Sequence, residues 1–218
     1  MTFRCRLDFL RHGESELSSV LRGSTDDALT AQGWTQMQHS VDAVAEKQIW
    51  PWQVVYSSPL QRCARFAEQV AQQHQRRCIL HAQLQEMHFG AWEAQPIAEL
   101  YAKYPEQLAQ FWQHPSLYTP PQAETLESFQ ARVEQALLIM VEDMAAQQLH
   151  RALVVSHGGV IKLLKTLALK QEIDLLLTQS AELGQLHHFE LALDDSRCKS
   201  GHRNLAMTDL KLSLGVEA

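Results

Sequence analysis

The amino-acid sequence predicts an α/β fold with three layers, α/β/α, around a mostly parallel sheet. Short, almost continuously apolar segments alternate along the chain with longer segments in which apolar residues recur every three to four positions. Apolar segments of this kind are typical of strands that are buried on both faces, as in a parallel sheet. At 218 residues, 45% of them hydrophobic, the chain is long enough to form one core. We therefore expect a single domain over residues 1–218.

Three segments are predicted to form the central strands. Residues 3–10 and 52–58 carry apolar runs, and residues 151–157, RALVVSH, are apolar almost throughout. Two further strands are expected near the end of the chain, in the segments LHHFELAL and LAMTDLKLSL. Their separation indicates a hairpin with a long connection.

Two helices are predicted from signals at their N-termini. Thr30 is expected to cap a helix whose apolar face consists of Trp34, Met37, Val41 and Val44. In the segment SPLQ, Ser58 is expected to cap a second helix in which Pro59 takes the first position. The apolar face of that helix consists of Leu60, Cys63, Ala64, Ala67 and Val70.

The rest of the chain predicts two more helices and an insertion. An apolar stripe at helical spacing indicates a helix over roughly 126–148, and Gly158-Gly159 begins another. The region at about 93–122 interrupts the alternation, because it holds five prolines and several aromatic residues. We expect it to be a helical insertion that lies over one end of the sheet and covers a site there.

Composition and charge exclude several classes of protein. The formal net charge is −6, so we expect no nucleic-acid surface, and an anionic ligand requires a local positive site. No run of about 18 apolar residues predicts a membrane span. The segment MTFRCRLDFL lacks the pattern of a signal peptide, so we expect a cytoplasmic protein. Reduced thiols and no zinc site are expected, because no C-x-x-C spacing joins Cys5, Cys63, Cys78 and Cys198.

Charged residues follow three of the predicted strands, at the edge where α/β sheets bind their ligands. Arg11 and His12 follow the first strand, and Arg22 lies in the loop after it. Arg62 lies in the first turn of the next helix, and His157 lies at the third junction. Guanidinium groups match phosphate oxygens, and helix N-termini add N–H donors. The sequence therefore predicts a phosphate site.

Four segments of the chain carry a resemblance to a known family. They are, in order, LRHGES, SSPLQRCARFAE, LQEMHFGAWE and VVSHGGVIKLL. Over roughly residues 5–170 they resemble the histidine phosphatase superfamily, which implies the phosphoglycerate mutase-like fold. The segments LRGSTDDALTAQGWTQM, FGAWE and FWQHPSLYTPP are most similar to the alpha-ribazole phosphatase branch. That branch implies removal of phosphate from a nucleotide-loop precursor in cobalamin synthesis.

The resemblance also implies a role for each charged residue. It implies that His12 is the nucleophile that becomes phosphohistidine and that Glu86 is the general acid. The residues implied to bind the phosphoryl group are Arg11, Arg62 and His157, with Arg22 adding positive charge. No metal or cofactor is expected, and the expected partner is a small phosphorylated metabolite.

Alternatives exist for the less specific positions. For Arg22 the alternative is an ion pair with Asp26 or Asp27. For Glu86 it is a surface carboxylate in front of an aromatic anchor. Further candidates for contact with phosphate are Ser15, Ser24 and Gly158. A turn-capping hydroxyl is the alternative for Ser15.

Three positions depart from the pattern of the family. Ser18 stands where many members have asparagine, and Ala94 follows Trp-Glu where glycine is common. The segment QAET, residues 122–125, replaces a usual glycine-glutamate pattern. These departures leave the catalytic set intact and bear on substrate contacts.

The sequence therefore predicts a phosphomonoesterase that acts through phosphohistidine, on alpha-ribazole 5′-phosphate or on a broad range of small phosphate esters. A phosphoglycerate mutase-type transfer is the first alternative. Hydrolysis is favoured because the chain lacks the additional segments by which cofactor-dependent mutases shield their phosphoenzyme from water. A non-catalytic protein that binds phosphorylated ligands is the second alternative, disfavoured because nucleophile and acid are both present. The sequence predicts no oligomeric state.

Overall fold

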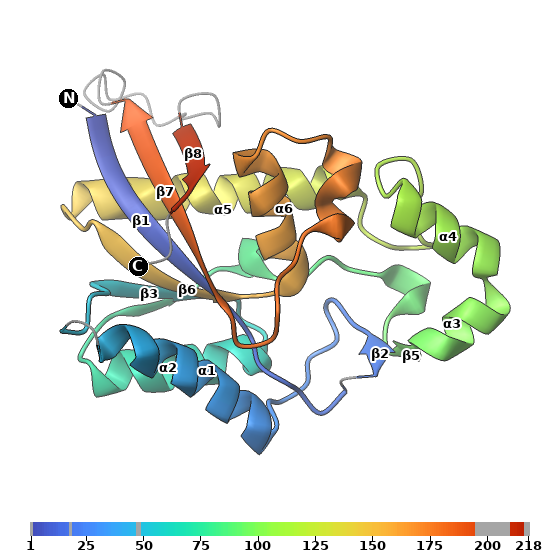
Figure 1. Cartoon of the computed structure of the whole chain (residues 1–218), viewed down its shortest axis with the longest axis horizontal. Helices are drawn as coiled ribbons and strands as arrows, with labels where there is room; N and C mark the ends of the chain where they lie inside the picture. Colours follow the sequence, from blue (N-terminus) through green and yellow to red (C-terminus); the bar gives the residue numbers. More distant parts are fainter. Residues whose placement is uncertain (1, 18, 47–48, 195–209, 216–218) are drawn as a thin grey trace.

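The computed structural model describes residues 2–17, 19–46, 49–194 and 210–215. Its centre is a six-stranded sheet in the order β4-β3-β6-β1-β7-β8 (Figure 1). The first four strands of that order run parallel, whereas β7 and β8 run antiparallel to their neighbours. The strands are β1 (Thr2–Arg11), β3 (Val54–Ser57), β4 (Cys78–Leu80), β6 (Arg151–Ser156), β7 (Leu186–Asp194) and β8 (Leu210–Leu214). The predicted mostly parallel sheet is confirmed.

Helices cover both faces of the sheet, which gives the predicted three layers (Figure 1). One face packs against α1 (Ala31–Ala45) and α2 (Gln61–Gln73). The other packs against α5 (Leu126–Ala146) and α6 (Gly158–Ala168). Adjacent strand residues divide between the two faces: Val154 is buried against α5 and α6, and Val155 against α1 and α2. Burial on both faces explains the continuous apolar run of residues 152–155 in β6.

The region 93–122 forms two helices, α3 (Ile97–Lys103) and α4 (Pro105–Gln113), beside the main body (Figure 1). A small antiparallel sheet of β2 (Val20–Leu21) and β5 (Gln95–Pro96) joins this insertion to the loop after β1. The described residues also form three 3-10 helices: η1 (Ala82–Leu84), η2 (Gly90–Trp92) and η3 (Ile173–Thr178). The insertion therefore stands next to the loop that follows Arg11.

One predicted helix cap is confirmed and one is wrong. Thr30 caps α1, since its hydroxyl accepts a hydrogen bond from the Gly33 amide at 3.0 Å. Helix α2 begins at Gln61, after Leu60, and not at Pro59. The Ser58 hydroxyl accepts a hydrogen bond of 3.3 Å from the amide of Leu60, just before the helix, and also lies 2.7 Å from Nε2 of His157, so it is shared between the start of α2 and a tertiary contact.

The two late strands are present as an antiparallel pair, β7 and β8. The described part of the segment LAMTDLKLSL begins at Leu210. Its first five residues, the connection between the two strands, Ser18 and Cys198 lie outside the described residues.

Candidate active site

Three parallel strands bring the candidate residues to one edge of the sheet. Strands β3, β6 and β1 are neighbours, and Arg11 at the end of β1 pairs with Ser156 at the end of β6. The His12 amide continues this pairing with a 3.0 Å hydrogen bond to the Ser156 carbonyl. The Ser58 amide donates likewise to the Val155 carbonyl at 2.9 Å. The loops after the three strands therefore begin side by side.

His12 is buried and held in one tautomer. Its Nδ1 lies 2.8 Å from the carbonyl oxygen of Gly13. A carbonyl only accepts, so Nδ1 carries the proton and Nε2 keeps its lone pair. Burial lowers the pKa of His12 well below 6.5, and the charge of Arg62 lowers it further. His12 is therefore a neutral imidazole with an unprotonated Nε2.

His157 packs against His12 at the bottom of the site. The two rings meet edge to face, with their centroids 5.3 Å apart. His157 is fully buried, and its Nε2 contacts the Ser58 hydroxyl. Burial lowers the pKa of His157 well below 6.5, and the positive charge of the nearby Arg62 lowers it further. Both imidazoles are therefore kept neutral by the same surroundings.

Arg62 is fully buried behind the two histidines. Its guanidinium donates to the carbonyls of Gly23 and Thr25, both at 2.7 Å, and to Oδ1 of Asp27 at 3.1 Å. Its buried Nε has no hydrogen-bond partner within the described residues. The side chain thus ties α2 to the loop after β2 while placing a positive charge next to His12.

Arg22 shares Asp27 with Arg62. Its Nε lies 3.5 Å from Oδ1 of Asp27, and its Nη1 donates to the Leu17 carbonyl. Asp26 has a different contact, because it accepts a hydrogen bond from the Gln61 amide at 2.8 Å. Of the two predicted acidic partners, Asp27 is the one that Arg22 contacts.

Arg11 lies on the opposite side, against α6. Its Nη1 donates to the carbonyl of Ala181 at 2.5 Å. The guanidinium packs on Gly158, where an added Cβ would lie 3.1 Å from it. Burial lowers the pKa of Arg11, and the negative charges of Glu86 and Glu182 oppose that shift. Gly158 therefore leaves the space that Arg11 occupies.

Glu86 reaches the same place from the segment after η1. Its Oε2 accepts a hydrogen bond of 2.9 Å from the backbone amide of Gly159, and its Oε1 accepts one of 3.0 Å from the Met87 amide. The carboxyl group therefore lies at the N-terminus of α6, beside Arg11, and is not a free surface group.

These residues border a pocket of about 390 Å³. Its charged and polar lining consists of Arg11, His12, Arg22, Glu86 and Lys162. Its apolar wall includes Ile97, Phe111 and Trp112 from the insertion, together with Phe129, Leu176 and Leu177. Gly158 and Gly159 also line the pocket. The insertion therefore forms part of the wall of this candidate pocket.

Four of the predicted site residues do not line the pocket. Arg62 and His157 are fully buried and lie behind the lining, next to His12. Ser15 is also buried, and its hydroxyl has no hydrogen-bond partner within the described residues. Ser24 is exposed, and its amide contacts Glu93 at 3.0 Å. Neither serine lies in the pocket lining.

Two residues at the site were missed by the sequence reasoning. Lys162 lines the pocket and lies four residues, about one helical turn, after Gly158 on α6. Residues at this spacing share a helix face, and this signal in the sequence could have revealed Lys162. Burial lowers the pKa of Lys162, and the charge of Arg11 lowers it further. Lys162 thus adds a cation on the α6 side of the pocket.

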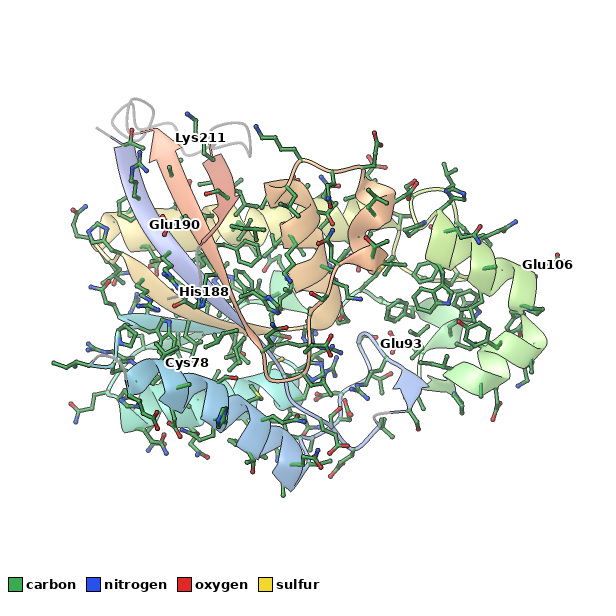
Figure 2. The ribbon with its side chains drawn as sticks, viewed as in Figure 1. Cys78, Glu93, Glu106, His188, Glu190 and Lys211 are labelled. Carbon is green, nitrogen blue, oxygen red and sulfur yellow. The ribbon has the colours of Figure 1, made fainter. Side chains whose placement is uncertain are left out.

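Glu93 is the second missed residue, and it lies beside β2 at the base of the insertion (Figure 2). It accepts hydrogen bonds from the amides of Gly23, Ser24, Thr25 and Phe89. Burial alone would raise the pKa of Glu93, but the hydrogen bonds from Phe89 and Thr25 bring it below its usual value. Glu93 therefore fixes the loop whose carbonyls hold Arg62.

The residues that the structure describes contain no cluster of three or more histidine, cysteine, aspartate or glutamate side chains suited to a metal ion. In the same residues, no helix is both long and apolar enough to cross a membrane.

The match to known families defines the class of this protein. The model of the histidine phosphatase superfamily (branch 1) matches residues 7–202. The chain belongs to this superfamily, whose members include phosphatases.

Individual relatives carry several different names. An adenosylcobalamin/alpha-ribazole phosphatase of Escherichia coli is 30% identical over 170 residues, which cover 73% of this chain and 76% of the relative. A bisphosphoglycerate-dependent phosphoglycerate mutase of Bartonella henselae is 26% identical over 163 residues, 72% and 78% of the two chains. A bifunctional protein of Mycobacterium tuberculosis is 31% identical over 194 residues, 87% of this chain, but this chain spans only about half, 51%, of its length.

Solved structures agree in fold. The crystal structure of the alpha-ribazole phosphatase from Shigella flexneri superimposes with a TM-score of 0.70 and 24% identity, covering 98% of this chain and 100% of the other. The phosphoglycerate mutase-like fold that the sequence predicts is thereby confirmed.

Proposed function

We propose that this chain is a phosphomonoesterase that forms a phosphohistidine at His12. The observation that carries the proposal is the contact between Nδ1 of His12 and the Gly13 carbonyl. It leaves Nε2 unprotonated in a pocket lined by arginines, and a neutral, oriented imidazole is a competent nucleophile toward a phosphoryl group.

In the first proposed step, the lone pair on Nε2 of His12 forms a bond to phosphorus, and the bond from phosphorus to the ester oxygen breaks. Glu86, in its acid form, gives its proton to that oxygen, so the leaving group departs as a neutral alcohol.

In the second proposed step, water attacks the phosphohistidine. Glu86, now ionised, accepts a proton from the water, and the phosphorus–nitrogen bond breaks to give inorganic phosphate and neutral His12. The charge that develops on the phosphoryl oxygens is stabilised by cations fixed in advance. Arg11 and Arg22 line the pocket, and the buried Arg62 and His157 support His12 from behind.

The cations of the chain are proposed to supply the charge that a metal ion supplies in other phosphatases. A metal chelator should therefore leave the rate of phosphate release unchanged. Loss of activity with chelator, restored by a divalent metal, would contradict this part of the proposal.

For the substrate, we propose alpha-ribazole 5′-phosphate, in cobalamin biosynthesis, with a broad range of small phosphate esters as the less specific form of the proposal. The apolar wall of Ile97, Phe111 and Trp112 supports a leaving group with an aromatic base, since such a wall binds flat apolar groups. The name of the Escherichia coli relative supports the same substrate. The cytoplasmic location and the absence of nucleic-acid partners stay predictions.

A panel of phosphate esters tests this proposal and separates it from its alternatives. Alpha-ribazole phosphate, phosphoserine, phosphoglycerate and nitrophenyl phosphate are assayed for inorganic phosphate, with His12→Ala as the control. Release of inorganic phosphate, fastest from alpha-ribazole phosphate, is expected. An isomerised phosphoester without free phosphate would indicate a mutase, and binding without any turnover would indicate a non-catalytic protein.

A further inference from the structure

We infer that Arg132 on α5, together with Glu124, is a positioning residue that holds Glu86 at the pocket. The inference rests on the proposed role of Glu86 as general acid. Arg132 itself does not line the pocket. It contacts the segment that carries Glu86 and also lies over the ring of the pocket residue Phe129, at 4.8 Å, so the test must separate an effect on the acid from a general effect on the pocket.

Arg132 binds the backbone around Glu86 directly. Its Nη1 donates to the carbonyls of Gln83 and Gln85 at 2.8 and 2.7 Å, and its Nη2 donates to the carbonyl of Glu86 itself at 2.9 Å. One guanidinium therefore fixes three carbonyls within four consecutive residues.

Glu124 orients the guanidinium for this task. Its two carboxylate oxygens accept from Nε and Nη2 of Arg132 at 2.6 and 2.8 Å, which is the paired geometry that a guanidinium makes with a carboxylate. Together with the three carbonyls, these contacts use all five N–H donors of the arginine. Lysine, with a single ammonium, cannot reproduce this set.

Glu124 also holds the other side of Glu86. Its Oε2 accepts from the His88 amide at 3.3 Å, and its own amide donates to the His88 carbonyl at 2.9 Å. The segment is thus fixed on both sides of residue 86.

The segment needs side-chain contacts because it has no regular structure of its own. Residues 86–89 lie between η1 and η2 and belong to neither a helix nor a strand. Upstream, the Leu84 carbonyl accepts from the Ser156 hydroxyl at 3.0 Å. A general acid must lie within about 3 Å of the oxygen that it protonates, so any drift of this backbone moves the carboxyl away from the leaving group.

A purely structural role for Arg132 predicts a different outcome. If the arginine only stabilises the fold, its loss lowers stability and slows all substrates alike. If it positions the acid, its loss slows the cleavage of esters with poor leaving groups and spares those whose leaving group departs without a proton.

The experiment compares single-turnover cleavage of glycerol phosphate and nitrophenyl phosphate in Arg132→Lys, Glu86→Gln and the double variant. We expect Arg132→Lys to slow glycerol phosphate by roughly 10 to 100-fold, the scale of a displacement of about 1 Å, and to slow nitrophenyl phosphate much less. In the Glu86→Gln background, Arg132→Lys should cause little further loss, since the group that it positions is already gone.

A matched control is Arg77→Lys. Arg77 pairs at 3.2 Å with Asp143, which lies on α5 like Arg132. Neither Arg77 nor Asp143 lines the pocket. It should leave both rates unchanged. If Arg132→Lys does not fold, Glu124→Gln gives the same test, because it removes the charge that orients the guanidinium and keeps the shape of the side chain.

Three outcomes would overturn the inference, and they are distinguishable. Equal losses for both esters in Arg132→Lys, or a loss that adds fully to that of Glu86→Gln, would show a structural role while leaving the acid role of Glu86 intact. Equal losses for both esters in Glu86→Gln itself would remove the acid role, and the inference with it.

Discussion

The backbone amide of Gly159 donates a hydrogen bond of 2.9 Å to Oε2 of Glu86. An added Cβ on Gly159 would lie only 2.2 Å from Oε1 of the same carboxyl group. Glycine is therefore needed here for space, because the residue lies within the regular helix α6. The first turn of α6 therefore both binds the carboxyl group of Glu86 and leaves the space that it occupies.

Gly159→Ala should lower activity by about 100-fold without lowering stability. The new methyl group must push the carboxyl of Glu86 out of position, and a misplacement of about 1 Å can cost about 100-fold in rate. Alanine has a higher helix propensity than glycine by about 0.5–1 kcal/mol, so the free energy of unfolding should not fall. Single-turnover rates and urea unfolding of the same variant measure both effects. Normal activity in Gly159→Ala would show that the carboxyl position does not matter.

The protonation of His12 gives a second prediction. Because burial and Arg62 hold the pKa of His12 well below 6.5, its ring should still be neutral at pH 6.5, with the proton on Nδ1. Nitrogen NMR of histidine-labelled protein reports the tautomer and the titration directly. A His12 signal that titrates near pH 6.5 would contradict the neutral nucleophile.

The same pKa shifts predict how stability depends on pH. Below about pH 6.5 an unfolded chain takes up protons on His12 and His157, whereas the folded protein does not. Stability is therefore fully present above that pH and falls as the pH drops, by about 1.4 kcal/mol per pH unit for each histidine. Urea unfolding between pH 8 and 5 should show this slope, and His12→Ala should reduce it. An unchanged slope in the variant would show that His12 is protonated when folded.

Two positions that depart from the family pattern carry a backbone cost. Ala94 and Gln122 have φ values of 57° and 62°, in the left-handed region that favours glycine. Ala94→Gly should therefore raise the free energy of unfolding by up to about 1 kcal/mol, since a left-handed residue with a side chain costs about 1–2 kcal/mol. Ala102→Gly, in the exposed part of α3, is the control and should lower it by about 0.5–1 kcal/mol. Equal destabilisation by both changes would rule out strain at Ala94.

The sequence predicted those features that depend on local periodicity. The stripe that ends at Met144 gave α5 to within two residues at its end, and the apolar run before His157 gave β6. Arg11, His12 and Glu86 meet in one pocket because three strand ends and one short segment converge there. Periodicity and strand-end position were sufficient for the helix, the strand, Arg11 and His12, whereas Glu86 was expected only from the resemblance to the family.

Features that depend on partners distant in sequence were not predictable. The Ser58 hydroxyl contacts His157, which is 99 positions away, in addition to the Leu60 amide just before α2. The guanidinium of Arg62 donates its hydrogen bonds to the loop that Glu93 holds. Arg62 therefore lies behind the pocket and not in its lining. Arg132 is a polar residue on an otherwise ordinary helix, and only the folded chain shows that it meets the carbonyl of Glu86.

The identity of the phosphorylated residue tests the central claim most directly. In a rapid-quench experiment with labelled alpha-ribazole phosphate or nitrophenyl phosphate, acid-labile and base-stable phosphate should accumulate on the enzyme, because phosphorus is then bound to nitrogen. Peptide mapping should place it on His12, and His12→Ala should carry no label and show no turnover while unfolding cooperatively. Label on a serine or on a cysteine such as Cys63, or near-normal turnover in His12→Ala, would contradict the proposed mechanism.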